Sequence, residues 1–168
     1  MRQLLIAVFL LCAAPAWADT RDPGTYFFQS TFGDLKAELA AAKMQGKQGI
    51  FLFFEMDDCP FCARMKSTIL NQSDVQDAYR AQFLVYSIDV NGDTPMTDFQ
   101  GKATTEKVFS LVNRVRATPT LLFFNLDGKL IARFTGPTKD KSEFLLLGKY
   151  VTENAYVTQS FTKYKRGK

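Results

Sequence analysis

Apolar and polar residues follow one another along the chain at spacings that predict alternating helices and strands. In the first such segment the apolar residues recur at helical spacing, which places Leu35 and Leu39 on one face. Thr31 and Asp34 resemble a capping box at the start of the segment. The pattern therefore predicts an amphipathic helix over residues 31–44.

Short runs of consecutive apolar residues predict strands that are buried on both faces. The four runs cover residues 49–54, 83–90, 121–125 and 130–134. The Asp127-Gly128 pair between the last two runs is typical of a hairpin turn. The segment 91–105 is polar and contains glycine and proline, so it is predicted to be a loop.

Helices are expected between most of these strands. They cover residues 59–70, a short segment from Ser73, 106–115 and 141–154. Strands separated by helices are expected to run parallel, and the closing hairpin adds an antiparallel pair. The predicted fold is α/β, with a mixed central sheet that has helices on both faces.

The first 18 residues have the pattern of a cleavable secretory signal peptide. Arg2 precedes an apolar run, and Ala16-Trp17-Ala18 forms an A-x-A cleavage site. The run is shorter than the roughly 20 residues that a membrane span needs, so no stable membrane insertion is expected. We predict cleavage after Ala18, loss of Cys12, and one exported, periplasmic domain over residues 19–168.

Composition narrows the possible chemistry. The 168 residues include 46% hydrophobic residues and no histidine, which is the composition of a folded protein without the commonest general base and metal ligand. Histidine-dependent catalysis and the usual zinc sites are therefore excluded. Without residues 1–18 the net charge is about +3, and the basic run 163–168 is predicted to be a solvated terminus. No nucleic-acid partner is expected for an exported protein.

Cys59 and Cys62 lie between a predicted strand and the start of a predicted helix. A zinc site would need four ligands, an iron–sulfur cluster would need a second chain, and covalent haem would need histidine where Ala63 stands. A structural disulfide over so short a loop would add little stability. We therefore favour the hypothesis that the two cysteines carry out dithiol–disulfide exchange. No metal is expected, and no cofactor beyond the cysteine pair.

The position of the cysteines at a helix N-terminus supports this hypothesis, because the unpaired N–H groups and the dipole of the helix favour an anion such as a thiolate. We expect Cys59 at the cap, outward and accessible, as the attacking group. Cys62, one turn further inward, would resolve the mixed disulfide. Pro60 suits the first helical position because it has no N–H.

A strand, a CxxC motif, a helix and then Thr118-Pro119-Thr120 entering a hairpin strand resemble the thioredoxin superfamily over roughly residues 32–150. The resemblance implies a thioredoxin fold in which Pro119 is cis and faces the cysteines. It also implies that Thr118 presents its backbone to a substrate strand.

Asp58, Pro60-Phe61 and Phe53 depart from the residues that thioredoxin itself has at these positions. The buried acid that precedes the first cysteine by six residues is Phe53 here, so Glu55 on the same strand face is our candidate proton acceptor for Cys62. The alternative is a solvated carboxylate at the strand end. Phe61, between the cysteines, is expected to be an exposed contact for partner proteins, or else to pack under the 91–105 loop.

The signal peptide, the long 91–105 segment and the sequence around each motif resemble the periplasmic thioredoxins of sulfur-oxidation systems, the SoxW type. This resemblance implies a monomeric reductase that keeps cysteines of partner proteins reduced and draws electrons from a membrane thiol-electron transporter. The same motif also serves disulfide oxidases and isomerases. A binding or chaperone module with an incidental disulfide is a further alternative.

Overall fold

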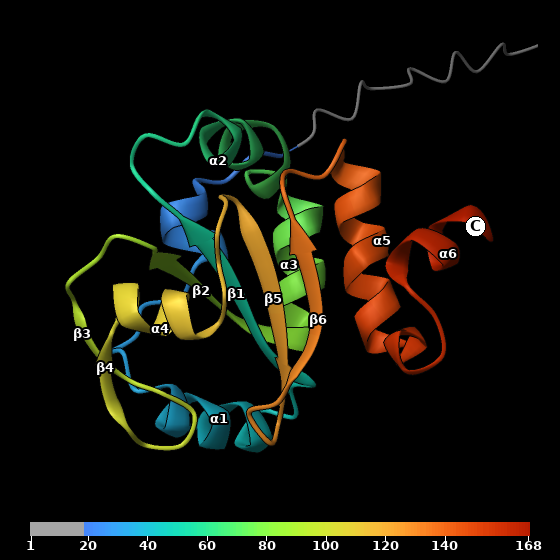
Figure 1. Ribbon diagram of the computed structural model, residues 1–168. Helices are drawn as coiled ribbons and strands as arrows, with labels where there is room; N and C mark the ends of the chain where they lie inside the picture. Colours follow the sequence, from blue (N-terminus) through green and yellow to red (C-terminus); the bar gives the residue numbers. More distant parts are fainter. Residues whose placement is uncertain (1–18) are drawn as a thin grey trace, which may run out of the picture.

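The computed structural model describes residues 19–168, and the predicted signal peptide, including Cys12 and the cleavage site, lies outside the described residues (Figure 1). Within this range no helix combines the length and the apolar character that crossing a lipid bilayer requires. A short π-helical segment, η1 (Pro23–Phe27), precedes the first α-helix and buries Phe27 completely.

A four-stranded mixed sheet forms the centre of the molecule, as expected. Its strands lie in the order β2 (Phe83–Asp89), β1 (Gly49–Glu55), β5 (Thr120–Asn125) and β6 (Leu130–Thr135). Strand β1 runs parallel to β2, and β5 is antiparallel to β6.

The expectation that all helix-separated strands run parallel is wrong for β5, which is antiparallel to β1. Strand β2 ends at Asp89 opposite Glu55, and β5 begins at Thr120 opposite Phe54. The connection between β2 and β5 therefore starts and finishes at the same end of the sheet. The chain therefore enters β5 in the direction opposite to that of β2.

Helices cover both faces of the sheet (Figure 1). They are α1 (Leu35–Met44), α2 (Pro60–Met65), α3 (Ser73–Gln82), α4 (Glu106–Val112) and α5 (Lys141–Thr152). Successive strand residues point to opposite faces, so β1 contributes to two cores. Phe51 and Phe53 pack with residues of α3 and α5, whereas Leu52 and Phe54 pack with residues of α1 and α4.

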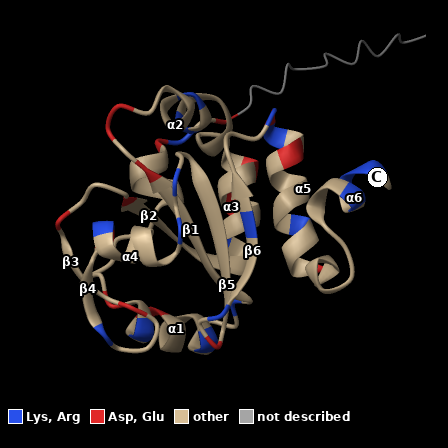
Figure 2. Cartoon of the chain, in the orientation of Figure 1, with Lys and Arg blue, Asp and Glu red and all other residues tan. Residues whose placement is uncertain are grey.

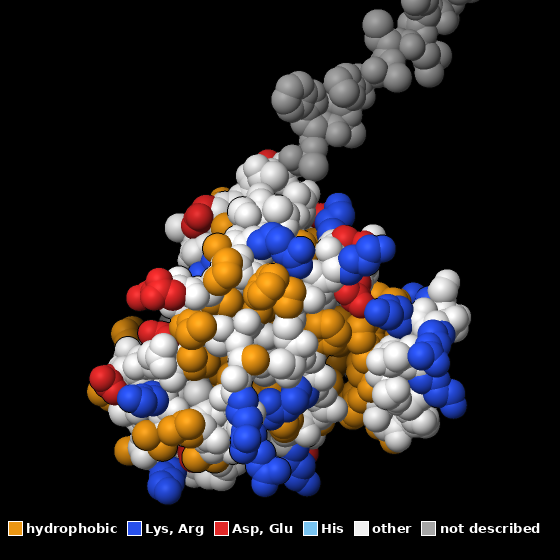
Figure 3. Space-filling view, turned by 45° about the horizontal axis from the view of Figure 1, so that its top comes forward, with side chains coloured by type: hydrophobic (Ala, Val, Ile, Leu, Met, Phe, Trp, Pro, Cys, Tyr) orange, Lys and Arg blue, Asp and Glu red, His pale blue; other side chains and the backbone are white. Residues whose placement is uncertain are grey.

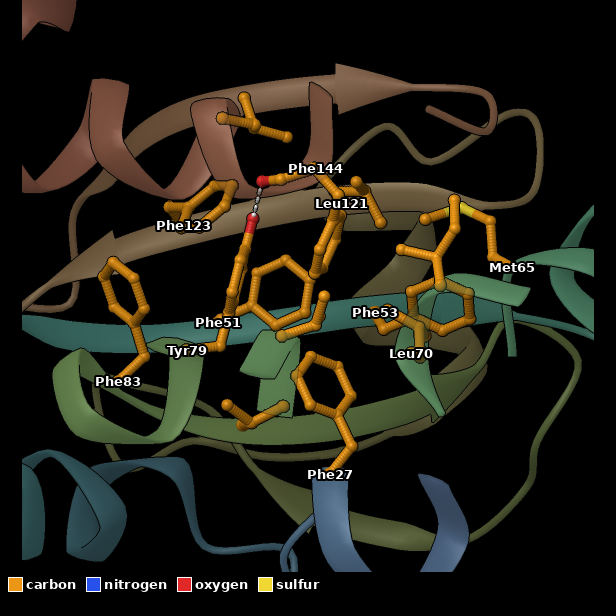
Figure 4. Close-up of a cluster of buried hydrophobic side chains, with 14 of the residues drawn as sticks. Phe27, Phe51, Phe53, Met65, Leu70, Tyr79, Phe83, Leu121, Phe123 and Phe144 are labelled. Carbon is orange, nitrogen blue, oxygen red and sulfur yellow. Dashed lines mark hydrogen bonds between the residues drawn. The ribbon is translucent and has the colours of Figure 1, made fainter. Parts of the chain in front are cut away.

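Aromatic rings dominate the core on the α3 and α5 side. Tyr79 and Phe144 stack with ring centroids 4.2 Å apart, and the Tyr79 hydroxyl donates to the Phe144 carbonyl at 2.7 Å (Figure 4). Phe51 lies against both rings and also against Phe123. These contacts pack α3 and α5 against the same face of the sheet.

Helix α1 begins at Leu35 rather than at the predicted Thr31. Gly33 has a φ of +78°, which interrupts the helical backbone just before it. The Asp34 side chain then caps the helix by accepting from the Ala37 N–H at 3.0 Å. The Thr31 hydroxyl instead accepts from the Gly33 N–H.

The segment 91–105, predicted to be a loop, contains a small hairpin of β3 (Pro95–Thr97) and β4 (Ala103–Thr105). The Asp98 carboxylate holds the turn by accepting from two backbone N–H groups at 2.9 Å each. Met96 and Phe99 are buried against the α1 side of the core. These two isolated apolar residues gave too weak a pattern to predict strands.

The C-terminal segment is folded, and the basic residues of the run 163–168 are solvent-exposed, as expected. A 3-10 turn, η3 (Ala155–Val157), leads to helix α6 (Phe161–Arg166), which lies beside α5 (Figure 1). Tyr164 is buried against Tyr150, and Phe161 packs against Phe134. Tyr164 is the one aromatic residue among these basic residues, and it faces the domain.

Candidate active site

The two cysteines lie where β1 is followed by α2. Cys59 is the N-cap residue of α2, and its sulfur accepts from the Cys62 N–H at 3.1 Å. Pro60 occupies the first helical position, as predicted. Cys59 and Cys62 form a disulfide with their Cα atoms 5.2 Å apart, so the structure represents the oxidised state of the pair. The helix continues past Met65 as a π-helical turn, η2 (Lys66–Leu70).

The expectation of an outward, accessible Cys59 is wrong for this state, because only 4% of the residue is exposed and 2% of Cys62. Both cysteines belong to the core on the α3 and α5 side, where they pack with Met65. Phe61 is 54% exposed, which confirms the expected exposure and excludes packing under the 91–105 segment.

A recess of about 400 Å³ gives access to the cysteine pair. Both cysteines line it, together with Glu55 at the end of β1 and Lys66 at the start of η2. A partner sulfur can therefore approach the disulfide from this side although little cysteine surface is exposed.

The Thr118–Pro119 peptide bond is cis, as the resemblance implied. Thr120, the next residue, is paired with Phe54 on β1, so this loop and the cysteines lie at the same end of the sheet. The Pro119 carbonyl accepts from the Gly136 N–H at 2.8 Å. Within residues 19–168 the Thr118 backbone makes no hydrogen bond to other backbone groups, and its buried hydroxyl has no partner.

Glu55 lies at the recess and is held in place by two side chains. Its carboxylate is 2.5 Å from the Lys66 amine and accepts a hydrogen bond from the Ser87 hydroxyl. Its side chain is only 17% exposed, so it is not a freely solvated carboxylate. Phe53, at the position of the usual buried acid, is completely buried in the core.

Sequence reasoning missed several residues of the recess, among them Ser87, Asp89 and Glu106. Burial and the charge of Asp89 raise the pKa of Glu106 above its ordinary value. Glu106 is the first residue of α4, and its carboxylate faces the Asp89 N–H at 3.4 Å. The parallel pairing of β1 and β2 could have indicated Ser87, which lies opposite Phe53.

Charges of both signs surround the cysteines. Asp57 and Asp58 are exposed in the loop before α2, whereas Arg64 and Lys66 follow within the helical segment (Figure 2). Acidic groups oppose formation of a thiolate and basic groups favour it. Among residues 19–168 no cluster of three or more histidine, cysteine, aspartate or glutamate residues is arranged to hold a metal ion.

Comparison with known proteins places these features in context. A family model described as a thioredoxin-like domain matches residues 35–152. No curated protein matches the chain.

Several solved structures are similar in fold. A thioredoxin-fold protein from Helicobacter pylori is 20% identical with a TM-score of 0.59, covering 72% of this chain and 82% of its own. A thioredoxin from Thermus thermophilus is 28% identical with a TM-score of 0.53, covering 69% and 82%. The reduced C-terminal domain of DsbD from Neisseria meningitidis is 22% identical with a TM-score of 0.52, covering 68% and 91%.

Proposed function

Because the chain belongs to the thioredoxin-like family, we propose that it is an exported thiol–disulfide oxidoreductase that reduces disulfides in other proteins. The observation that carries this proposal is the Cys59–Cys62 disulfide, which begins α2 at the same end of the sheet as the cis bond before Pro119. The cysteine pair is the redox group, so the proposed reaction uses no metal and no further cofactor.

The reaction consists of two thiol exchanges. In the dithiol form the Cys59 thiolate attacks one sulfur of a partner disulfide, which forms a mixed disulfide and releases the other partner sulfur as a thiolate. The Cys62 thiolate then attacks the Cys59 sulfur and releases the second partner sulfur. Two electrons pass to the partner, and the 59–62 disulfide forms.

The geometry at the start of α2 supports these assignments. The Cys62 N–H lies at the helix N-terminus, where it has no hydrogen-bond partner within the helix, and it donates to the Cys59 sulfur at 3.1 Å. In the dithiol form the same N–H would stabilise a thiolate at Cys59. Cys62 lies one helical turn further along α2 and, like Cys59, is almost completely buried. It is therefore placed to attack a sulfur already bonded to Cys59 rather than an incoming partner.

Glu55 is proposed as the proton acceptor for Cys62. Lys66 and Ser87 hold its carboxylate at the recess that both cysteines line. The contacts with Lys66 and Ser87 fix the position of carboxylate oxygens that can accept a proton.

Thr118 and Pro119 are proposed to orient the substrate backbone. The unpaired backbone groups of Thr118 can bond to an extended segment of a partner, as a sheet edge does. The exposed ring of Phe61 would contact apolar side chains of that partner. The substrates are proteins with disulfides or oxidised cysteines, and neither nucleic acid nor a second copy of the chain is required.

The finer assignment is a SoxW-type periplasmic reductase that is reduced again by a membrane thiol-electron transporter. Its support is the sequence resemblance, the pattern of residues 1–18 and the 28% identity to a thioredoxin. A reduction potential measured against glutathione tests the direction of electron flow. We expect a value near about −270 mV, whereas a value near about −120 mV would identify an oxidase.

Reduction of insulin disulfides tests the function itself. We expect turnover by the wild-type protein and at least a thousandfold loss in Cys59→Ser, because the attacking thiolate is absent. Cys62→Ser should instead accumulate a mixed disulfide through Cys59, and mass spectrometry of the trapped species would identify partners. If Cys59→Ser/Cys62→Ser retained the biological activity of the wild type, a non-catalytic binding module would be the better description.

A further inference from the structure

Three arginines surround one recess beside the proposed active site. Arg114 and Arg116 come from the loop between α4 and β5, and Arg133 comes from β6. The recess has a volume of about 490 Å³, and all three side chains line it and are exposed. The space-filling view has a group of basic side chains next to apolar ones on this face (Figure 3).

These positive charges are not neutralised by the protein itself. In the part of the chain that the structure describes, none of the three arginines forms an ion pair with a carboxylate. No acidic residue lines the recess. The Arg133 guanidinium donates to the Asn113 carbonyl, and partial burial together with the neighbouring charge of Arg114 lowers the pKa of Arg133. Such a cluster is stabilised when an anion binds to it.

The recess extends along β6, from Thr135 at the end of the sheet that carries the cysteines to Leu130 near the β5–β6 turn. Arg116 precedes the cis bond before Pro119 by a few residues, and Arg133 precedes Thr135, which pairs with Thr120. Extended backbone rises about 3.3 Å per residue. A partner strand that pairs with Thr118 and continues past Arg116 therefore comes to the arginines within a few residues.

Apolar side chains border the arginines. Val112 is 74% exposed and Leu111 66%, both on the last turn of α4. Val112 and Leu130 line the arginine recess and also a second recess of about 500 Å³ beside the β3–β4 hairpin. The surface thus combines bidentate donors for carboxylates with an apolar strip, which is a composition typical of a protein-binding site.

We propose that Arg114, Arg116 and Arg133 bind acidic side chains that lie close in sequence to the target cysteine of the substrate protein. This inference rests on the proposed function and adds the chemical class of the substrate segment. Arginine forms paired hydrogen bonds with carboxylates, and its positive field also accelerates the approach of an acidic partner.

Binding can be measured apart from catalysis. The probes are two short fluorescent peptides with a central serine, one flanked by glutamates and the other by glutamines. At about 0.01 M salt, where the Debye length is about 30 Å, we expect fluorescence anisotropy to give about tenfold tighter binding of the glutamate peptide. Arg116→Glu/Arg133→Glu should remove this preference, and the milder Arg116→Gln/Arg133→Gln should reduce it.

A control of equal charge separates a local site from the net charge. Lys36→Glu/Lys163→Glu changes two exposed lysines on α1 and α6, so it alters the charge as much as the arginine reversal does. It should retain most of the preference. Equal binding of the two peptides by the wild type would overturn the inference, as would an equal loss of preference in both double variants.

Reduction kinetics separate this inference from the proposed function. The substrates are disulfide-linked dimers of the same peptides with cysteine in place of the central serine. We expect the dithiol form to reduce the glutamate dimer about tenfold faster at low salt, and the rate ratio to approach one in the arginine reversal. If neither dimer is reduced while the serine peptides still bind differently, the reductase proposal fails and the anion-binding surface stands.

Discussion

The carboxylate of Glu55 lies at the recess that both cysteines line, and two contacts define its position. Lys66 approaches it from η2 at 2.5 Å, and Ser87 donates to it from β2. The ring of Phe53 fills the core position two residues earlier on the same strand face. Glu55 can serve as the proton acceptor although Phe53 occupies the core, because Glu55 lies at the end of the strand, outside the aromatic core.

We expect Glu55→Gln to slow the attack of Cys62 on the mixed disulfide by about a hundredfold near neutral pH, because general-base catalysis contributes about that much. The first step, attack by Cys59, should change far less. Stopped-flow measurement of mixed-disulfide formation and decay between pH 5 and 9 separates the two steps.

Asp127→Asn is the matched control, since this carboxylate is exposed in the β5–β6 turn at the other end of the sheet. The rate of decay in this variant should equal that of the wild type. A decay rate in Glu55→Gln that follows the wild-type pH profile would assign Glu55 a purely structural role.

Sequence patterns correctly predicted those helices and strands whose formation depends on residues close together in the sequence. The strand of continuous apolar residues around Phe51 and the helix that begins after Cys59 both formed as expected. The β3–β4 hairpin was missed because Met96 and Phe99 are buried through contacts with α1, which no window of a few residues contains. The direction of β5 depends in the same way on the path of a long connection.

The recess was predictable only in part, for a related reason. CxxC and Thr118-Pro119 are sequence motifs, so their residues could be named in advance. Ser87 and Glu106 reach the recess from β2 and α4, far from either motif in sequence. Only the pairing of β1 with β2 and the docking of α4 bring them there, and neither follows from residue spacing.

The start of α1 gives a test of an element boundary. We expect Asp34→Ala to lower the free energy of unfolding by about 1 kcal/mol, because it removes the side chain that caps the Ala37 N–H. Thr31→Ala is the control and should cost less, since the Thr31 hydroxyl caps no helical N–H: it accepts from the Gly33 N–H and donates to the Glu38 carboxylate on α1. Urea denaturation of both variants measures the difference. A larger loss in Thr31→Ala would place the helix start where the sequence pattern predicted it.

In the molecule as a whole, the residues proposed to exchange thiols lie apart from the contact between α5 and α6, which contributes to stability. The disulfide and the cis bond lie at one end of the sheet, and the arginine recess runs from that end along β6. Helix α6 packs along the side of α5 (Figure 1). Tyr164 makes the buried contact of α6 and donates to the Glu153 carboxylate at 2.6 Å. Changes at this contact should therefore alter stability without altering thiol exchange.

Tyr164→Phe tests this separation and its dependence on pH. We expect a loss of about 1 kcal/mol in the free energy of unfolding at pH 7, because the ring stays packed and one hydrogen bond is removed. Burial and the Glu153 carboxylate raise the pKa of Tyr164 to about 12. The protonated hydroxyl thus favours the folded state below about pH 10, and this advantage is lost as the pH rises from about 10 to about 12. The unfolding energies of wild type and variant should therefore converge over that range.

Urea denaturation at several alkaline pH values measures the convergence, since the other tyrosines titrate alike in both proteins. Tyr156→Phe is the control, because its hydroxyl contacts only Asn154, two residues away. It should show only a small difference from the wild type at pH 7, because only this local contact is removed. Both variants should reduce insulin at the wild-type rate. A slower rate in Tyr164→Phe alone would show that the contact between α5 and α6 also positions the end of the sheet at which the cysteines react.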